Sequence, residues 1–490
     1  MRRDPGDSRS NNALGLLLLR QGQFERAENH FRMAIERMTR HNPNPVDGEA
    51  YFNLGQSLRY QGRLDEAYDA FYKATWNGAM QGCGFLALGQ TAGLKGNFAA
   101  AAEFASLALA RQYHNQQARL LKITALRRLG QKGEARAEIE LAVSQDPLDF
   151  GALYEQVLLG GDKQQTQRVF DLMRDEAHNY LELAWDYGQA GFFNEASDLL
   201  AEYIRRFEGE RFVNPMVYYD AGYYYLQAGN AAAARKWFGR GAIARPDGCF
   251  PHRLESILVL RAVLNENPAD ARAAYYLGNL WYGKRQYDLA TQSWERSCQL
   301  DEAFATVHRN LGLAYYNRRQ DRTGALNHYQ RAFDLDQTDA RVLLELDQLK
   351  KKLGIDIVTR LDYLRCYQPL VMKRDDLCVE YITLLNLTGF YQEALELMRQ
   401  RQFHPWEGGE GKVTGAWATA LTELAKQELV KGHGATAVDY LDQALTWPEN
   451  LGEGKLAGHH EQDIYYYMAL ACRMSGRSNE TNKWLVSAPA

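Results

Sequence analysis

The 490-residue sequence has few cysteines and prolines, and no apolar run in it reaches the length of a membrane span. The first residues lack the apolar core of a signal peptide, since Leu16 to Leu19 form only a short cluster. No Cys-x-x-Cys pair occurs, which argues against a zinc knuckle or a disulfide framework and favours a reducing compartment. The six scattered cysteines are Cys83, Cys249, Cys298, Cys366, Cys378 and Cys472. We therefore expect a cytoplasmic protein that does not insert into a membrane.

An excess of positive charge is also missing. The sequence has 57 basic and 61 acidic residues, for a net charge of −4. Binding to a phosphate backbone needs a basic excess or patch. The composition therefore argues against nucleic acid as a partner.

The main feature that the sequence does contain is a recurring pattern of small residues. Leu54-Gly55 is followed by Gly62, Ala67, Phe71 and Ala74. Further copies can be aligned on one alanine of each: Ala27, Ala67, Ala101, Ala135, Ala196, Ala234, Ala290, Ala325, Ala394 and Ala437. The steps from Ala67 to Ala101 and from Ala101 to Ala135 are 34 residues, and the step from Ala290 to Ala325 is 35. Spacing of this kind predicts a repeat of two helices.

Small residues have a mechanical role in such a repeat. Gly and Ala let two helix axes approach closely, and a large apolar side chain one turn later fills the space beside them. Proline cannot continue a helix, because it has no amide donor. We therefore expect second helices to stop before four prolines: Pro147, Pro246, Pro268 and Pro448.

This pattern resembles that of the tetratricopeptide repeat family over most of the chain. This resemblance implies an all-α protein whose helical hairpins stack in a right-handed superhelical solenoid. We expect repeats 1–4 in residues 1–147 and two well-formed repeats in 251–338. Irregular repeats fall in 148–250, degenerate helices in 339–401, and C-terminal repeats with Gly-Glu loops in 402–490. Because Asp4-Pro5-Gly6-Asp7 looks like the tail of a preceding repeat, the chain is expected to derive from a longer protein.

The family geometry implies which side chains line the concave groove. The side chains placed there are Arg20, Gln56, Arg59, Tyr60, Gln90, Arg127, Arg128, Trp185, Tyr219, Tyr223, Tyr275, Asn279, Tyr282, Arg309 and Tyr316. The groove is then basic early and aromatic late, which favours an extended peptide of acidic character. The alternative is that many of these tyrosines pack between adjacent repeats. The lysine and asparagine clamp of some chaperone-binding members is not matched.

The C-terminal part contains two glycine-rich strings that do not follow the repeat pattern. Trp406-Glu407-Gly408-Gly409-Glu410-Gly411-Lys412 and Leu451-Gly452-Glu453-Gly454-Lys455 are predicted turns that place charged groups at one end of the groove. A phosphate loop is rejected, because Trp406 and Val413 stand where it needs Gly and Ser or Thr. Glu407 and Glu410 have no fixed separation, so a glycosidase pair is disfavoured. His459, His460 and Asp463 are not proposed as metal ligands, and no cofactor is expected.

The same strings resemble the closing region of large bacterial tetratricopeptide proteins. Longer members of that group carry an N-terminal β-rich domain similar to galactose mutarotases, which is absent here. The sequence therefore favours a non-catalytic scaffold that binds a peptide or a partner domain in its groove. The alternative is an accessory region of a carbohydrate-active protein, in which the repeats shape or cover the sugar site of the missing domain. In that case the loops that carry Trp406, Glu407, Glu410 and Glu453 touch the sugar.

Overall fold

The computed structural model describes residues 4–45, 47–209, 212–454 and 461–487. Within these ranges the chain is helical, and none of the described residues forms a β-strand. The helices divide into two compact units, unit 1 (Met1–Asp301) and unit 2 (Glu302–Ala490). The all-α prediction is therefore confirmed, while the five predicted segments stay a prediction.

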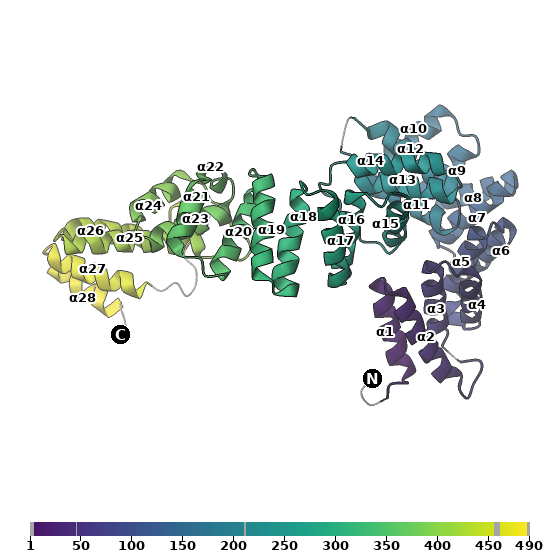
Figure 1. Ribbon diagram of the computed structural model, residues 1–490, viewed down its shortest axis with the longest axis horizontal. Helices are drawn as coiled ribbons and strands as arrows, with labels where there is room; N and C mark the ends of the chain where they lie inside the picture. Colours follow the sequence, from purple (N-terminus) through teal and green to yellow (C-terminus); the bar gives the residue numbers. More distant parts are fainter. Residues whose placement is uncertain (1–3, 46, 210–211, 455–460, 488–490) are drawn as a thin grey trace. The chain divides into compact units, whose positions relative to one another are not determined.

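Unit 1 consists of helical hairpins and one additional helix (Figure 1). Its helices are α1 (Ser8–Arg20), α2 (Phe24–Thr39), α3 (Glu49–Tyr60), α4 (Leu64–Ala74), α5 (Gln81–Leu94), α6 (Phe98–Arg111), α7 (Gln116–Arg128), α8 (Lys132–Gln145), α9 (Phe150–Leu158), α10 (Lys163–Met173), α11 (Ala177–Gln189), α12 (Phe193–Phe207), α13 (Pro215–Gln227), α14 (Ala231–Ile243), α15 (Glu255–Glu266), α16 (Ala271–Gly283) and α17 (Tyr287–Leu300). Each odd-numbered helix up to α13 forms a hairpin with the helix that follows it, and α16 forms one with α17. Helix α15 stands between two hairpins and packs on α13 and α16.

Unit 2 begins with a regular hairpin and continues less regularly. Its helices are α18 (Ala305–Ala314), α19 (Arg322–Leu335), α20 (Ala340–Lys352), α21 (Ile357–Arg365), α22 (Gln368–Val371), α23 (Asp375–Leu387), α24 (Tyr391–Gln400), α25 (Lys412–Val430), α26 (Gly434–Ala444), α27 (Gln462–Met474) and α28 (Ser478–Ser487). The hairpins α23–α24, α25–α26 and α27–α28 follow the shorter helices α21 and α22.

A glycine in the first helix of a hairpin receives an aromatic ring from the second helix. In five hairpins a Cβ on that glycine would lie closer than 3.0 Å to the ring. The five pairs are Gly15 with Phe31, Gly55 with Phe71, Gly222 with Phe238, Gly278 with Trp294, and Gly312 with Tyr329. The predicted close approach of the helices is therefore confirmed at these positions.

One hairpin holds an extra residue, which the structure places in a π-helical turn. Gly312 and Tyr329 are 17 residues apart, whereas the other four glycine–ring pairs are separated by 16. Residues Tyr315–Arg319 form the π turn, and Gln320 ends it in the left-handed region at φ 55°. A π turn absorbs one inserted residue without breaking the helix. The 35-residue step in the sequence has this physical cause.

Three of the four prolines mark the helix ends that the sequence predicted. Pro147, Pro246 and Pro448 follow the second helices α8, α14 and α26. Pro268 instead follows α15, which has no hairpin partner of its own. The prediction was wrong at Pro268, because any helix end suits a proline and the residue does not show which helix it stops.

In unit 1, the first hairpin contacts helices near the end of the unit. The turn after α1 touches α15 and α16, since a Cβ on Gly22 would lie 2.7 Å from Ile257 and 2.9 Å from Trp281. The amide of Gln23 donates to Gln286 Oε1 at 2.7 Å, although the two residues are 263 positions apart. These contacts bring the first and last hairpins of unit 1 together.

We expect Gly222→Ala to destabilise unit 1 by about 1–3 kcal/mol, because the added methyl group overpacks the Phe238 ring. The matched control is Gly239→Ala on α14 of the same hairpin, where a Cβ would meet no atom within 4 Å. There the substitution gains helix propensity and should stabilise by about 0.5–1 kcal/mol. Denaturant unfolding followed by circular dichroism measures both, and equal effects would contradict the packing role of Gly222.

Candidate functional site

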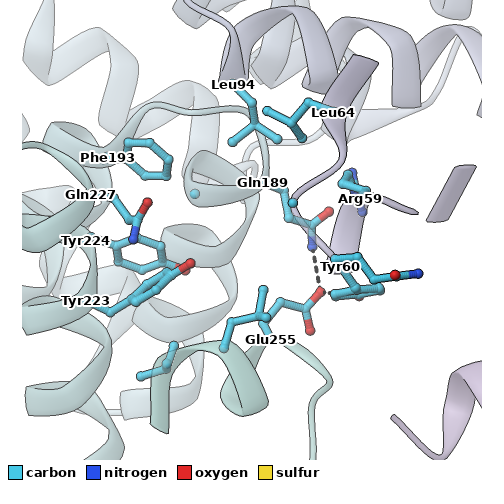
Figure 2. A pocket seen from close by; sticks show the side chains of 15 residues that line it. Arg59, Tyr60, Leu64, Leu94, Gln189, Phe193, Tyr223, Tyr224, Gln227 and Glu255 are labelled. Carbon is cyan, nitrogen blue, oxygen red and sulfur yellow. Dashed lines mark hydrogen bonds between the residues drawn. The ribbon is translucent and has the colours of Figure 1, made fainter. Parts of the chain in front are cut away.

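A cavity of about 390 Å³ opens on the inner surface of unit 1 (Figure 2). Its walls come from the ends of several helices that are far apart in sequence. The lining residues are Arg59, Tyr60, Gln61, Gly62, Leu64, Leu94, Gly188, Gln189, Phe193, Tyr223, Tyr224, Gln227, Glu255, Leu258 and Val259. Concave sites of this size with mostly apolar walls and a few convergent polar groups are typical ligand pockets.

Glu255, the first residue of α15, is the polar centre of this cavity. Its Oε1 accepts a hydrogen bond from the Tyr60 hydroxyl at 2.9 Å and one from Gln189 Nε2 at 3.3 Å. Burial and the neighbouring Glu255 carboxylate both raise the pKa of Tyr60. Tyr60 therefore stays protonated and donates to the carboxylate.

Across the cavity, α13 presents side chains that make no hydrogen bond to other described residues. They are Tyr223, Tyr224 and Gln227, and Figure 2 shows them facing Glu255. The Tyr224 ring lies against Gly188, where a side chain would fill its place. Glycine at this crossing thus sets the position of the tyrosine wall.

Three residues from the predicted groove set line this cavity: Arg59, Tyr60 and Tyr223. Arg59 is held by the Gln90 amide, whose Oε1 accepts from Nη1 at 2.8 Å. Their contact with a partner stays a prediction.

Three of the arginines predicted for the groove form ion pairs with carboxylates of this chain. Arg127 donates to the fully buried Glu155 from Nε at 2.5 Å and to Glu195 from Nη2 at 2.8 Å. Arg128 shares Glu195 at 3.1 Å. In unit 2, Arg309 forms a bidentate pair with Glu345. These arginines are thus neutralised by carboxylates of neighbouring helices, which the groove pattern did not consider.

Several aromatic residues predicted for the groove are buried inside unit 1. Trp185 is 4% exposed, Tyr219 0% and Tyr275 4%. The Trp185 indole donates to Asp220 at 2.8 Å, and the Tyr219 hydroxyl donates to Asp270 at 3.1 Å. A ligand on the surface would not reach these side chains. Their positions agree with the alternative interpretation, in which they pack between adjacent repeats.

The remaining predicted groove residues do not join the cavity. Arg20 is exposed at the end of α1. Asn279 accepts a hydrogen bond from Trp294, and the Tyr282 ring lies 5.4 Å from the same indole. Tyr316 belongs to the π turn of unit 2 and lies below the Lys352 ammonium at 5.5 Å.

The structure brings the two Gly-Glu strings of unit 2 together. Trp406, Glu407, Glu410 and Glu453 line one cavity of about 280 Å³. Glu453 accepts from the backbone N–H groups of Gly411 at 2.9 Å and Thr414 at 3.2 Å, so it caps the start of α25. Contact of these residues with a sugar stays a prediction.

Part of the candidate metal-binding sequence falls outside the residues that the structure describes. Lys455, His459 and His460 lie outside the described residues. In the described ranges no group of three or more His, Cys, Asp or Glu side chains is arranged to hold a metal ion. No described helix combines the length and the apolar character needed to cross a bilayer.

Removing the Arg127 side chain should destabilise unit 1 strongly. Arg127→Ala leaves the Glu155 carboxylate buried without its cation, which costs about 3–5 kcal/mol. Arg128→Ala is the control, because its side chain is 34% exposed and Arg127 still pairs with Glu195. The control should cost about 1 kcal/mol or less. Denaturant midpoints of the two variants provide the measurement, and a similar shift for both would contradict the assignment.

Asp220 should make the stability of unit 1 pH-dependent. It is fully buried, its Oδ2 has no partner among the described residues, and burial raises its pKa from 3.8 to about 7. Between these values the folded state binds more protons than the unfolded state, so the free energy of unfolding falls as the pH rises through this window. We expect Asp220→Asn to remove this component. The test is unfolding of both proteins from pH 4 to pH 8, where parallel curves would refute the assignment.

Two segments of the chain match family models, both described as tetratricopeptide repeat. One model matches residues 6–75 and the other matches residues 181–248. These segments hold the hairpins α1–α2, α3–α4, α11–α12 and α13–α14.

Several solved structures are similar at low identity. The MamA RS-1 ArsTM double mutant is 22% identical, covers 40% of this chain and 96% of its own, and has a TM-score of 0.23. Yeast Tom70 is 14% identical, with 90% and 99% covered and a TM-score of 0.26. A MamA crystal structure is 18% identical, with 41% and 96% covered and a TM-score of 0.20. Likenesses at this level support no inference about a ligand.

The matched models and the observed glycine–ring packing agree on the kind of repeat. The spacing of that packing continues from the matched segments into α16–α17 and, with one inserted residue, into α18–α19. The chain therefore contains tetratricopeptide repeats in residues 6–75 and 181–248, within a longer array of stacked helical hairpins.

Proposed function

We propose that this protein is a non-catalytic interaction scaffold and that unit 1 binds a protein partner at the cavity around Glu255. Repeat solenoids use their inner surfaces as extended binding surfaces. The observation that carries the proposal is the convergence of apolar walls with polar groups from α3, α13 and α15, of which the α13 side chains make no hydrogen bond to other described residues. Binding sites in proteins are concave, largely apolar and supplied with a few polar groups.

The partner contacts the cavity rather than a charged inner surface. Arg127, Arg128 and Arg309 are each paired with carboxylates of this chain, so they offer little charge to an acidic peptide. Nucleic acid is not proposed for the same reason, since phosphate contacts need available cations. An aromatic or aliphatic anchor that fills a pocket is the usual source of affinity at protein interfaces.

Closing the cavity should abolish partner binding without unfolding the protein. Gln227 is exposed at the end of α13, and Gln227→Trp places an indole in the mouth of the cavity. Gln427→Trp on α25 is the control, because Gln427 is also an exposed helical glutamine without a hydrogen-bond partner among the described residues.

Quantitative affinity capture from the native cell extract compares the wild type with both variants. We expect the wild type and Gln427→Trp to retain similar amounts of partner protein. The amount retained by Gln227→Trp should be at least tenfold lower. Circular dichroism and the unfolding midpoint establish that each variant is folded. Equal retention of every captured protein by the three chains would refute the cavity as the binding surface.

A further inference from the structure

One carboxylate oxygen in the cavity of unit 1 makes no hydrogen bond to other described residues. Tyr60 and Gln189 both donate to Oε1 of Glu255, while Oε2 accepts no hydrogen bond among the described residues. Figure 2 shows the carboxylate at the edge of the cavity, opposite Tyr223 and Gln227. A carboxylate oxygen accepts and does not donate. The ligand atom that meets Oε2 therefore carries a hydrogen.

The remaining walls of the cavity are apolar or aromatic, so they favour a ligand group of the same kind. Leu64, Leu94, Phe193, Leu258 and Val259 supply aliphatic and aromatic surface. The rings of Tyr223 and Tyr224 form the facing wall, and they stand 5.5 Å apart at 63° to each other. Such walls suit an aromatic side chain, since aromatic rings prefer offset or edge-to-face neighbours.

A carboxylate among aromatic rings often binds a cation, but the surrounding charge argues against one here. Arg59 lines the same cavity, and Arg253 acts electrostatically on Tyr60 together with Glu255. Lys284 also lies in the field of Glu255, and burial lowers its pKa. Arg253 is itself paired with Glu182 at 2.6 Å, so Arg59 and Lys284 are the cations that offset the Glu255 charge. The cavity therefore has no excess negative charge for an incoming ammonium or guanidinium group.

We propose that the cavity binds a tyrosine or tryptophan side chain of the protein partner, whose O–H or N–H donates to Glu255 Oε2. The ring packs between the α13 tyrosines and the aliphatic wall, and the polar tip reaches the carboxylate. This inference rests on the proposed function, because it names the residue class through which the partner enters. Buried aromatic anchors with one hydrogen bond are the residues that dominate binding energy at interfaces.

Blocked amino acids test the assignment directly on the full chain. The probes are the N-acetyl amides of tryptophan, tyrosine, phenylalanine and lysine, each titrated at millimolar concentrations with saturation-transfer NMR. We expect the tryptophan and tyrosine amides to bind. The phenylalanine amide should bind about tenfold more weakly than the tyrosine amide, because it lacks the donor to a charged acceptor. The lysine amide should bind most weakly.

Two variants, with one control variant, connect binding of the probes to this cavity. Gln227→Trp should abolish binding of the tryptophan and tyrosine amides, whereas Gln427→Trp should leave it unchanged. Glu255→Gln retains the shape but removes the charge, and it should weaken the tyrosine amide roughly fivefold while leaving the phenylalanine amide within twofold.

The possible outcomes separate this inference from the proposed function. Tightest binding by the lysine amide, equal binding of the tyrosine and phenylalanine amides, or no binding by any probe would each overturn the aromatic-donor assignment. If Gln227→Trp still abolishes partner capture in those cases, the scaffold function stands and only the residue class is wrong. If the tyrosine amide binds but Gln227→Trp leaves partner capture unchanged, the cavity binds aromatic side chains and the proposed function is wrong.

Discussion

Close packing of an aromatic ring on a glycine is the contact on which the helical hairpins depend. At Gly55 and Gly222 there is no room for even a methyl group, because the Phe71 and Phe238 rings occupy that space. This contact fixes how near the two helices approach and so fixes the repeat spacing. Where one residue is inserted, as between Gly312 and Tyr329, the helix widens into a π turn and the ring still reaches its glycine. The chain changes its backbone locally and keeps the contact.

Curvature of the stack in unit 1 then brings distant side chains together. Gln23 meets Gln286, and Tyr60 meets Glu255, although each pair is separated by most of the unit in sequence. A cavity with apolar walls remains beside α13 and α15 on the inner surface. Arginines such as Arg127 are neutralised by carboxylates of other helices of the unit. Under our proposal, recognition at this surface depends on shape and on the Glu255 acceptor more than on net charge.

Sequence patterns predicted the features that depend on neighbours within one hairpin. Gly55 and Phe71 are such a pair, since 16 residues separate them and local geometry decides their contact. Glu255 was missed because it begins a helix without a hairpin partner, and its contact with Tyr60 depends on the curvature of the whole stack. Arg127 and Tyr219 were placed on the inner surface by family geometry, which states a direction but not the depth of burial or the carboxylate that meets them. A search for acidic residues on the first helix of the next hairpin would have found Glu155 as the partner of Arg127, whereas Glu195 lies 68 residues away on α12.

We propose the cavity between α3, α13 and α15 as the surface that unit 1 offers to a partner. Hydrogen–deuterium exchange of the full chain, with and without its most strongly retained partner, locates the surface that the partner covers. We expect added protection of backbone amides at the end of α3, the end of α13 and the start of α15. Protection confined to the outer helices α2, α4 and α14, or to unit 2, with no change around Glu255, would contradict it.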